Sequence, residues 1–245
     1  MSLSDEDLWF CKKNGYHRLP EPLPDHLVDR LNRTTDHEIA ALNEPIVWEE
    51  TDSRAPSDIR RLSKILTRDP VYMAAATHPP ILDTLEYFLG PNIELLTNKH
   101  NHSMVRTPNS GVVFWHTGEQ IYDPVLFTAL IYLEESTVEN GCIRIVPGSH
   151  HRPFRGEKRY PANEFAHHAL YHRALPVPMP RGGVLLFDDH LYHGADVNRT
   201  PSSRRSMTLG YRAHDAHDVL KDDPEKILVR GGRVYTGYTH PSPES

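Results

Sequence analysis

The sequence has 245 residues, a formal net charge of -6 and 38% hydrophobic residues, which suits a single globular domain. The negative balance argues against general binding of nucleic-acid polymers. Because no apolar run reaches membrane-spanning length and the polar, acidic start does not look like a signal peptide, we expect a soluble cytoplasmic protein. The cysteines, Cys11 and Cys142, are too few for a disulfide framework or a zinc pattern. The 17 histidines instead favour nitrogen and oxygen ligands for any bound metal.

The first ninety residues carry mainly helix signals. Ser4, with Asp7 three positions later, predicts a helix start, and a glycine or a proline pair predicts where each helix ends or breaks. The elements expected here are, in chain order, a helix that Gly15 ends, a short strand at 16–19, a helix at 25–43, a polar loop at 51–60, and two helices over 70–89 that are broken at 78–80.

From residue 93 onward the pattern changes to short β-rich runs that are separated by turn residues. The strands expected are 93–96, 103–107, 112–115, 126–133, 142–146, 183–187 and 206–212, with a further strand at 233–238. Helices followed by many short strands predict an antiparallel β-sandwich with a helical flank. Residues 150–181 form a long irregular insertion, and such a loop inside a compact domain is usually functional.

Two histidines stand out because each lies at the end of a strand-like run. His116 ends the apolar run Val-Val-Phe-Trp, and His193 follows the strand expected at 183–187. Strand ends meet loops at the mouth of a barrel, where a ligand can be held. Two histidines and a carboxylate on one face of the metal are the ligand set of non-haem iron(II) oxygenases, so these two histidines are candidate metal ligands.

The chain resembles the phytanoyl-CoA dioxygenase family of iron(II)- and 2-oxoglutarate-dependent oxygenases over about residues 8–213. The matching motifs are Gly15-Tyr16, His78-Pro79, Leu89-Gly90-Pro91, Trp115-His116, Glu139-Asn140-Gly141-Cys142, Pro147-Gly148-Ser149-His150, His193-Gly194 and the segment 198–205. The resemblance implies a mainly β fold with flanking helices, a double-stranded β-helix of the jelly-roll, cupin-like kind. It implies one domain over residues 1–245 with a substrate lid at about 150–181, and it implies iron(II), 2-oxoglutarate and O2 as reactants.

The resemblance also assigns roles to individual residues. His116 and His193 match the iron-binding histidines, and Arg204 matches the arginine that holds the far carboxylate of 2-oxoglutarate. A planar guanidinium suits that role because it grips a carboxylate through two parallel hydrogen bonds. Thr128 and His102 are candidates for further contacts with 2-oxoglutarate, although each also suits a purely structural role.

Strand alternation places Arg212 on the same face as Arg204. If Arg204 points into the barrel, Arg212 does so too. A buried arginine needs an anionic partner, and the substrate is one candidate.

The metal motif departs from the family at its third position. The family has Asp or Glu there, whereas this chain has Gly118, which has no side chain and cannot bind a metal. We favour a halogenase, since 2-oxoglutarate halogenases carry Gly or Ala at this position and bind a halide in the vacancy. Chloride or bromide would then be transferred to an unactivated carbon of the substrate.

Two other interpretations of Gly118 remain open. One is a hydroxylase of the same family that uses a substitute carboxylate, for which Glu119, Asp188 and Asp189 are candidates. The other is a binding module that has lost catalysis and keeps only its ligand. The intact histidine pair and Arg204 argue against such a loss.

The substrate is expected to be a free small molecule, because no docking element for a carrier protein is evident. The insertion is rich in cations and aromatic rings, with Arg152 and Arg155 as candidate substrate contacts. Arginine with aromatic rings suits a phosphate joined to a flat ring. A nucleotide such as a deoxyadenosine monophosphate therefore fits, as in nucleoside antibiotic biosynthesis. A free amino acid such as lysine is the alternative substrate, and a solvated charged loop is the plainer interpretation of the insertion.

Overall fold

The fold is seen in a computed structural model that describes residues 3–49, 55–108, 115–118, 126–151, 159–160, 164, 167, 169–214 and 226–232. Its first helix shows how local sequence sets the element boundaries. The hydroxyl of Ser4 accepts a hydrogen bond from the Asp7 amide, which caps the helix start. Gly15 ends the helix in the left-handed region at φ 84°, a conformation that glycine adopts at little cost.

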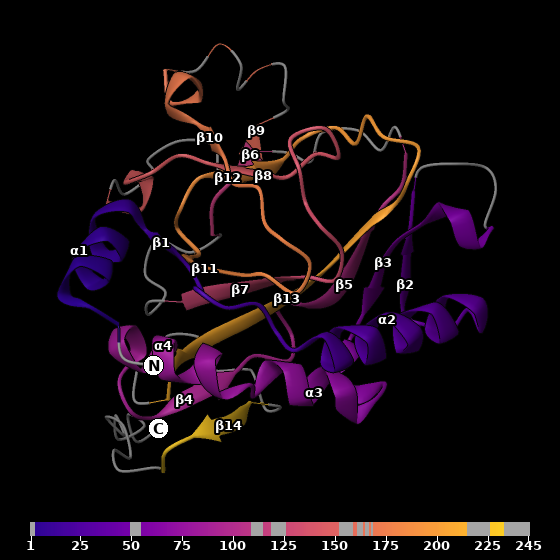
Figure 1. The fold of residues 1–245 in the computed structure, drawn as a ribbon, viewed down its shortest axis with the longest axis horizontal. Coiled ribbons are helices and arrows are strands. Elements are labelled where there is room, and N and C mark those ends of the chain that lie inside the picture. Colours follow the sequence, from indigo (N-terminus) through magenta and orange to yellow (C-terminus); the bar gives the residue numbers. More distant parts are fainter. Residues whose placement is uncertain are drawn as a thin grey trace, which may run out of the picture.

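All but the first of the described α-helices lie along one side of the molecule (Figure 1). Pro79 separates two of them, because proline starts a helix readily but cannot continue one. The α-helices are α1 (Asp5–Asn14), α2 (Asp25–Ala40), α3 (Pro70–Ala76) and α4 (Pro79–Leu89), and short 3-10 turns span Pro56–Asp58, Ile65–Thr67, Ser149–His151 and Tyr171–Arg173.

The strands of the described chain form two antiparallel sheets. The larger runs in the order β1 (Tyr16–Arg18), β11 (Val184–Asp188), β7 (Leu126–Tyr132), β13 (Arg204–Ala213), β5 (Asn101–Arg106), β3 (Ile59–Ser63) and β2 (Ile46–Trp48), with β4 (Ile93–Leu95) between β13 and β14 (Ile227–Arg230). The smaller runs in the order β10 (Leu175–Pro176), β8 (Ile143–Ile145), β12 (His193–Ala195), β6 (Trp115–His116) and β9 (Arg159–Tyr160).

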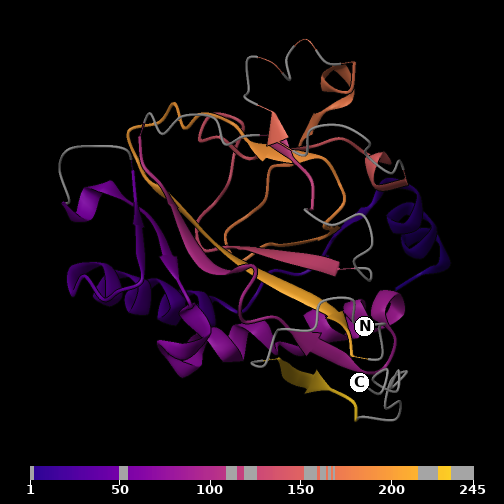
Figure 2. The same cartoon turned by 180° about the vertical axis from the view of Figure 1, so that it is seen from behind.

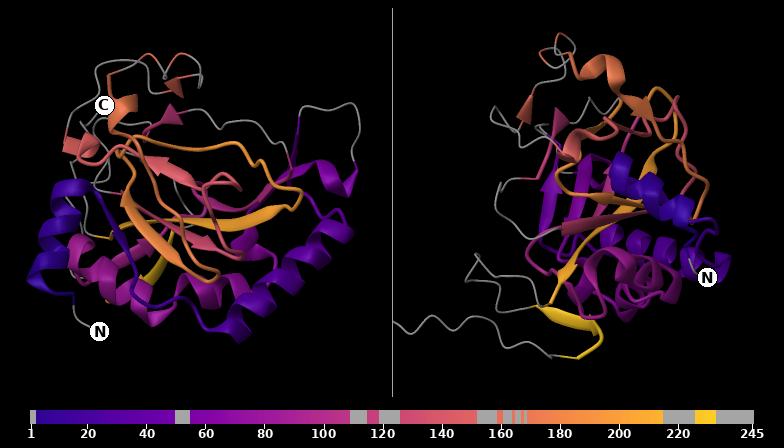
Figure 3. Two further views of the ribbon diagram at one scale, coloured as in Figure 1. Left: turned by 45° about the horizontal axis from the view of Figure 1, so that its top comes forward. Right: turned by 90° about the vertical axis from the view of Figure 1, so that its left-hand side faces the viewer.

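The two sheets and the helices form three layers. In Figure 1 the smaller sheet lies above the larger one, and helices α2, α3 and α4 lie below it. The side view on the right of Figure 3 shows the same layering, with these helices on the face of the larger sheet that points away from the smaller sheet. Figure 2 shows β5 and β13, which are paired along most of their length, crossing the molecule side by side.

Alternation along the central strands divides their side chains between two environments. On β7, Ala129 and Ile131 are fully buried in the core against the helices. Thr128 and Leu130 point the other way and line a cavity between the sheets. The layer between helices and larger sheet is therefore the main apolar core, and the space between the sheets is left for the site.

The expected jelly-roll architecture, the helix pair around 78–80 and most of the strands are confirmed. The polar loop expected at 51–60 is wrong at its end, because β3 begins at Ile59. Strands β2, β9, β10, β12 and β14 were not expected, and none of them is longer than four residues. The strand expected at 233–238 and most of the one expected at 112–115 lie outside the described residues. Of the described helices, none has both the length and the apolar character needed to cross a membrane.

Replacing Ile131 with alanine tests the importance of the helix-facing core. Ile131 is fully buried on the central strand β7, so Ile131→Ala is expected to lower the free energy of unfolding by about 2–5 kcal/mol in urea denaturation. Val138, which is 46% exposed, provides the control, and Val138→Ala should change stability by less than about 0.5 kcal/mol. Equal small effects of both substitutions would contradict the assignment of the core.

Candidate active site

His116 and His193 lie side by side on neighbouring strands of the smaller sheet. Strands β6 and β12 pair antiparallel with these residues as direct partners, so the two side chains leave the same face. Their ring centroids are 4.2 Å apart. Nδ1 of His193 lies 2.7 Å from the carbonyl oxygen of Leu191, an arrangement typical of histidines that bind a metal through the other nitrogen. Burial, with a smaller effect of His116, lowers the pKa of His193 to about 3, which keeps this ring neutral at pH 7.

The chain after His116 is fastened to the turn that precedes His193. The Thr117 hydroxyl donates to the carbonyl oxygen of His190 at 2.6 Å, and the Gly118 amide donates to the carbonyl oxygen of Asp189 at 2.7 Å. A Cβ atom at position 118 would lie 2.4 Å from Oδ2 of Asp189. The Asp189 carboxylate therefore occupies space that any side chain at position 118 would need.

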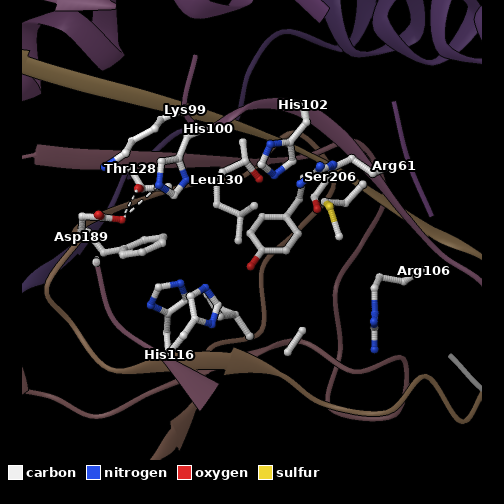
Figure 4. Close-up of a pocket in the computed structure, with 18 of the residues that line it drawn as sticks. Arg61, Lys99, His100, His102, Arg106, His116, Thr128, Leu130, Asp189 and Ser206 are labelled. Atoms are coloured by element: carbon white, nitrogen blue, oxygen red, sulfur yellow. Dashed lines mark hydrogen bonds and ion pairs between the residues drawn. The ribbon is translucent and has the colours of Figure 1, made fainter. Parts of the chain in front are cut away.

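Asp189 is a buried anion next to the histidine pair. Its Oδ1 lies 3.2 Å from Nε2 of His100 and 3.4 Å from the hydroxyl of Thr128, which donates to it; Figure 4 shows these contacts as dashed lines. Burial alone would raise the pKa of Asp189. The hydrogen bond and charge of His100, with smaller effects of His193 and Lys99, outweigh burial and lower that pKa to about 2.

Arg204 lies at the start of β13 and lines the same cavity. Its guanidinium carbon is 5.8 Å from the ring centroid of Tyr132. Nη2 donates to the carbonyl oxygen of Gly141 at 2.9 Å, and Nε donates to that of Asn140 at 3.3 Å. Burial lowers the pKa of Arg204, and within the described chain no carboxylate lies at ion-pair distance from it. A buried cation held by neutral carbonyls is suited to an anionic ligand.

Thr128 and His102 both line the cavity from the larger sheet. The hydroxyl of fully buried Thr128 already donates to Asp189. His102 lies on β5 opposite Thr208 of β13, and Figure 4 shows its ring on the larger-sheet side, across from His116. Burial, together with His100 and Arg61, lowers the pKa of His102 to about 3. Contact of either residue with 2-oxoglutarate stays a prediction.

These residues surround a cavity of about 370 Å³ whose lining is strongly positive. The cationic residues of the lining are Arg60, Arg61, Lys99, Arg106 and Arg204. Asp189 is the one carboxylate among the described residues of that lining. Such a cavity favours anionic ligands. Apart from Arg204, these cations were missed in the sequence, where the only signal was the dipeptide Arg60-Arg61 at the end of a segment that was expected to be a loop.

The histidine pair fits a transition metal such as iron(II), because two imidazoles from adjacent strands leave the other metal positions open for smaller ligands. Across the described part of the chain, no three His, Cys, Asp or Glu side chains already form a metal-binding group. Asp189 is paired with His100 instead. The pair with His100 uses Oδ1, whereas Oδ2 is the carboxylate oxygen nearest position 118, so a metal contact through Oδ2 does not require the pair with His100 to break.

Of the two adjacent acids considered as substitutes, only Asp189 reaches the cavity. Oδ1 of Asp188 accepts a hydrogen bond from the His190 amide at 2.9 Å and lies 3.1 Å from the His190 ring nitrogen. Asp188 is not part of the cavity lining. Glu119, Arg152 and Arg155 lie outside the described residues, so the roles expected for them stay predictions.

The expectation that Arg212 binds substrate is wrong. Its Nε donates to Oε2 of Glu94 at 2.8 Å, and both side chains are less than a tenth exposed. His214 contacts the other oxygen of the same carboxylate. Strand β13 is ten residues long, so Arg212 lies beyond the cavity even though alternation puts it on the face of Arg204. Its anionic partner is Glu94.

A jelly roll that encloses two adjacent histidines, with a buried arginine lining the same cavity, has the form of a non-haem iron oxygenase. A sequence profile of the phytanoyl-CoA dioxygenase (PhyH) family matches residues 11–206. The chain therefore belongs to the phytanoyl-CoA dioxygenase family, which consists of enzymes of the non-haem iron, 2-oxoglutarate-dependent kind. The expectation drawn from its motifs is confirmed at the level of the family.

Two related proteins match most of the chain. A probable alpha-ketoglutarate-dependent hypophosphite dioxygenase of Stutzerimonas stutzeri is 27% identical over 209 residues, which cover 79% of this chain and 72% of the relative. Methylphosphonate hydroxylase of Gimesia maris is 26% identical over 227 residues, which cover 90% of this chain and 85% of the relative. Both relatives are named as oxygenating enzymes.

Solved structures of similar fold agree with the jelly-roll assignment. EctD from S. alaskensis with bound Fe has a TM-score of 0.70 at 22% identity, covering 86% of this chain and 77% of EctD. The epimerase SnoN in complex with Fe3+, alpha ketoglutarate and nogalamycin RO has a TM-score of 0.72 at 20% identity, covering 90% of both chains. At these identities the likeness defines the fold and not the substrate.

The buried pair of Arg212 and Glu94 gives a test of the structure outside the cavity. Glu94→Gln keeps the shape but leaves the Arg212 charge buried without its anion, so we expect a loss of about 3–5 kcal/mol in the free energy of unfolding. The control is Glu86→Gln, which removes an exposed partner of Arg230 and should cost at most about 1 kcal/mol. Thermal or urea denaturation measures both, and equal losses would contradict the burial of the first pair.

Proposed function

We propose that this protein is an iron(II)- and 2-oxoglutarate-dependent hydroxylase of a small molecule, in which Asp189 supplies the carboxylate that Gly118 lacks. The observation that carries the proposal is the position of the Asp189 carboxylate. One of its oxygens lies 2.4 Å from the point where a Cβ of residue 118 would stand. A carboxylate from the neighbouring turn would thus take the corner that the family fills with a side chain from the metal motif itself.

Each remaining role falls on a residue of the cavity. His116 and His193 would hold iron(II), and Arg204 would bind the far carboxylate of 2-oxoglutarate through charge-assisted hydrogen bonds. The bound iron, with 2-oxoglutarate and O2, supplies the oxidising power to attack an unactivated C–H bond. Leu130, Ile143 and Phe187 add apolar surface to the lining, which limits water around the reacting centre.

The charge of Asp189 is the main physical argument against a halide in the same corner. Asp189 is an ionised, buried group, and a chloride or bromide beside it would meet a like charge at short range, where the protein screens charges less than water does. If Asp189 itself binds the iron, its carboxylate supplies the negative charge that a halide ligand would otherwise supply, and no second anion is needed. The hydroxylase and dioxygenase names of two relatives agree with this choice.

The halogenase expected from the His116-Thr117-Gly118 motif is the second candidate, because one observation favours it. Asp189 is held by His100 at 3.2 Å, and the described residues form no complete three-residue metal group. If the carboxylate stays with His100 and neither of its oxygens binds iron, the corner at Gly118 is open for chloride or bromide. A nucleotide substrate such as a deoxyadenosine monophosphate belongs to this second candidate.

Moving the carboxylate back to position 118 tests the role of Asp189. Asp189→Asn is expected to weaken iron(II) binding at least about tenfold, because it removes the charged ligand. The double variant Gly118→Asp/Asp189→Ala should recover most of that affinity, since its carboxylate stands at the position used by the family. Anaerobic calorimetric titration with iron(II) measures both variants. Asp188→Asn is the matched control and should bind iron(II) as the native protein does.

Two results would overturn the hydroxylase proposal. The first is native iron(II) affinity in Asp189→Asn. The second is a product that carries the chlorine isotope pair when the native protein turns over with iron(II), 2-oxoglutarate, chloride and O2 in a panel of candidate substrates. A product that gains one oxygen and no halogen in the presence of chloride supports the proposal.

Arg204→Ala tests the 2-oxoglutarate site separately from the metal. Loss of charge-assisted hydrogen bonds should weaken 2-oxoglutarate binding about 10- to 100-fold in calorimetric titration. Arg205→Ala is the control, because Arg205 points to the other side of β13 and pairs with Glu134 at 2.7 Å and Asp36 at 2.6 Å. Unchanged 2-oxoglutarate affinity in Arg204→Ala would move this role to another residue.

A further inference from the structure

Arg60 and Arg61 are adjacent in sequence and yet both line the cavity. Consecutive residues of a regular strand point to opposite faces. Here β3 is irregular, because Val47 of β2 pairs with Arg61 whereas Trp48 pairs with Ile59. Arg60 is therefore the extra residue of a β-bulge, a feature that often re-aims side chains beside active sites. The bulge brings two guanidinium groups to one wall of the cavity while Ile59 and Leu62 stay in the core.

Neither arginine has an ion-pair or hydrogen-bond partner for its side chain among the described residues. Nε of Arg61 is buried and without a partner, and Figure 4 shows Arg61 next to Ser206 and His102, on the side of the cavity away from Asp189. Burial, with a smaller effect of the charge of Arg60, lowers the pKa of Arg61. Two like charges in a partly dehydrated wall destabilise the free protein unless an anion joins them.

The charges of iron and 2-oxoglutarate do not neutralise the positive charge of Arg60 and Arg61. Iron(II) brings two positive charges and 2-oxoglutarate brings two negative charges, so together they leave the balance of the cavity unchanged. Arg204 is already assigned to 2-oxoglutarate, and Arg106 donates to the carbonyl oxygen of Asp196 at 3.0 Å. Among the described residues no anion faces Arg60 and Arg61, and a dianionic group matches their two positive charges better than a single carboxylate does.

We propose that Arg60 and Arg61 bind a phosphate or phosphonate group of the organic substrate. The proposal rests on the function proposed above and names the substrate class of that site. A guanidinium donates two parallel hydrogen bonds to such a group, and two guanidinium groups side by side match its several oxygens. This contact holds one end of the substrate at β3 and leaves its carbon part to extend toward His116 and His193.

Binding of simple probes to the iron-loaded protein tests the proposal. Iron(II) and saturating 2-oxoglutarate are bound first under anaerobic conditions, so that Arg204 is already occupied. Methylphosphonate, methyl phosphate, inorganic phosphate and acetate are then titrated at constant ionic strength by calorimetry. We expect the phosphonate or the phosphate ester to bind at least tenfold more tightly than acetate. Arg60→Gln and Arg61→Gln should each weaken that binding at least tenfold.

Arg181→Gln is the matched control, because Arg181 pairs with Asp25 and Asp29 on the outer surface and its loss removes the same charge far from the cavity. Native probe affinity in both cavity variants, or acetate binding as tightly as the phosphorus anions, overturns the proposal. Tightest binding of inorganic phosphate, with no gain from a carbon substituent, overturns it as well and indicates a free anion site. The affinities for iron(II) and 2-oxoglutarate are measured in the same series. If the proposed function is wrong, the native protein fails to bind iron(II) or 2-oxoglutarate, and this failure is seen separately from any effect on the phosphorus probes.

Discussion

The antiparallel pairing of β6 with β12 is the contact on which the whole site depends. It sets His116 opposite His193 and brings the chain after His116 against the turn before His193. The amide of Gly118 then bonds to the backbone of Asp189, which leaves no room for a side chain at position 118. The pairing therefore sets the Asp189 carboxylate beside the position where the family carries its metal carboxylate, and the proposed role of Asp189 depends on it.

Buried charge links this corner to the rest of the cavity. Asp189 is stabilised as an anion by His100, and Arg204 is held by the carbonyl oxygens of Asn140 and Gly141. Since desolvated charges need partners, each such group indicates a ligand or an internal counter-ion. Arg212 shows the second case, because its counter-ion is Glu94. Arg60 and Arg61 have no such counter-ion among the described residues, and for this reason we infer that their partner is the substrate.

The sequence was sufficient for features that rest on local signals. The cap at Ser4, the proline break near residue 79 and the β-rich runs after residue 93 predicted the layered architecture, and family motifs identified His116, His193 and Arg204.

The arrangement around Gly118 was not predictable in the same way, because Asp188 and Asp189 were equal candidates until the turn showed which of them faces the cavity. Arg60 and Arg61 were missed because their shared orientation depends on a bulge between β2 and β3. Arg212 was misassigned because alternation gives the face of a strand but not where along its length the cavity ends.

The central claim is that Asp189 provides the carboxylate beside the metal. The most direct test is a crystal structure of the protein prepared without oxygen, with iron(II), 2-oxoglutarate and a high concentration of bromide, whose anomalous scattering identifies it. We expect a carboxylate oxygen of Asp189 bound to the metal and no bromide peak next to it. A bromide bound to the metal beside Gly118, with Asp189 still paired to His100, would contradict the account and support halogenation.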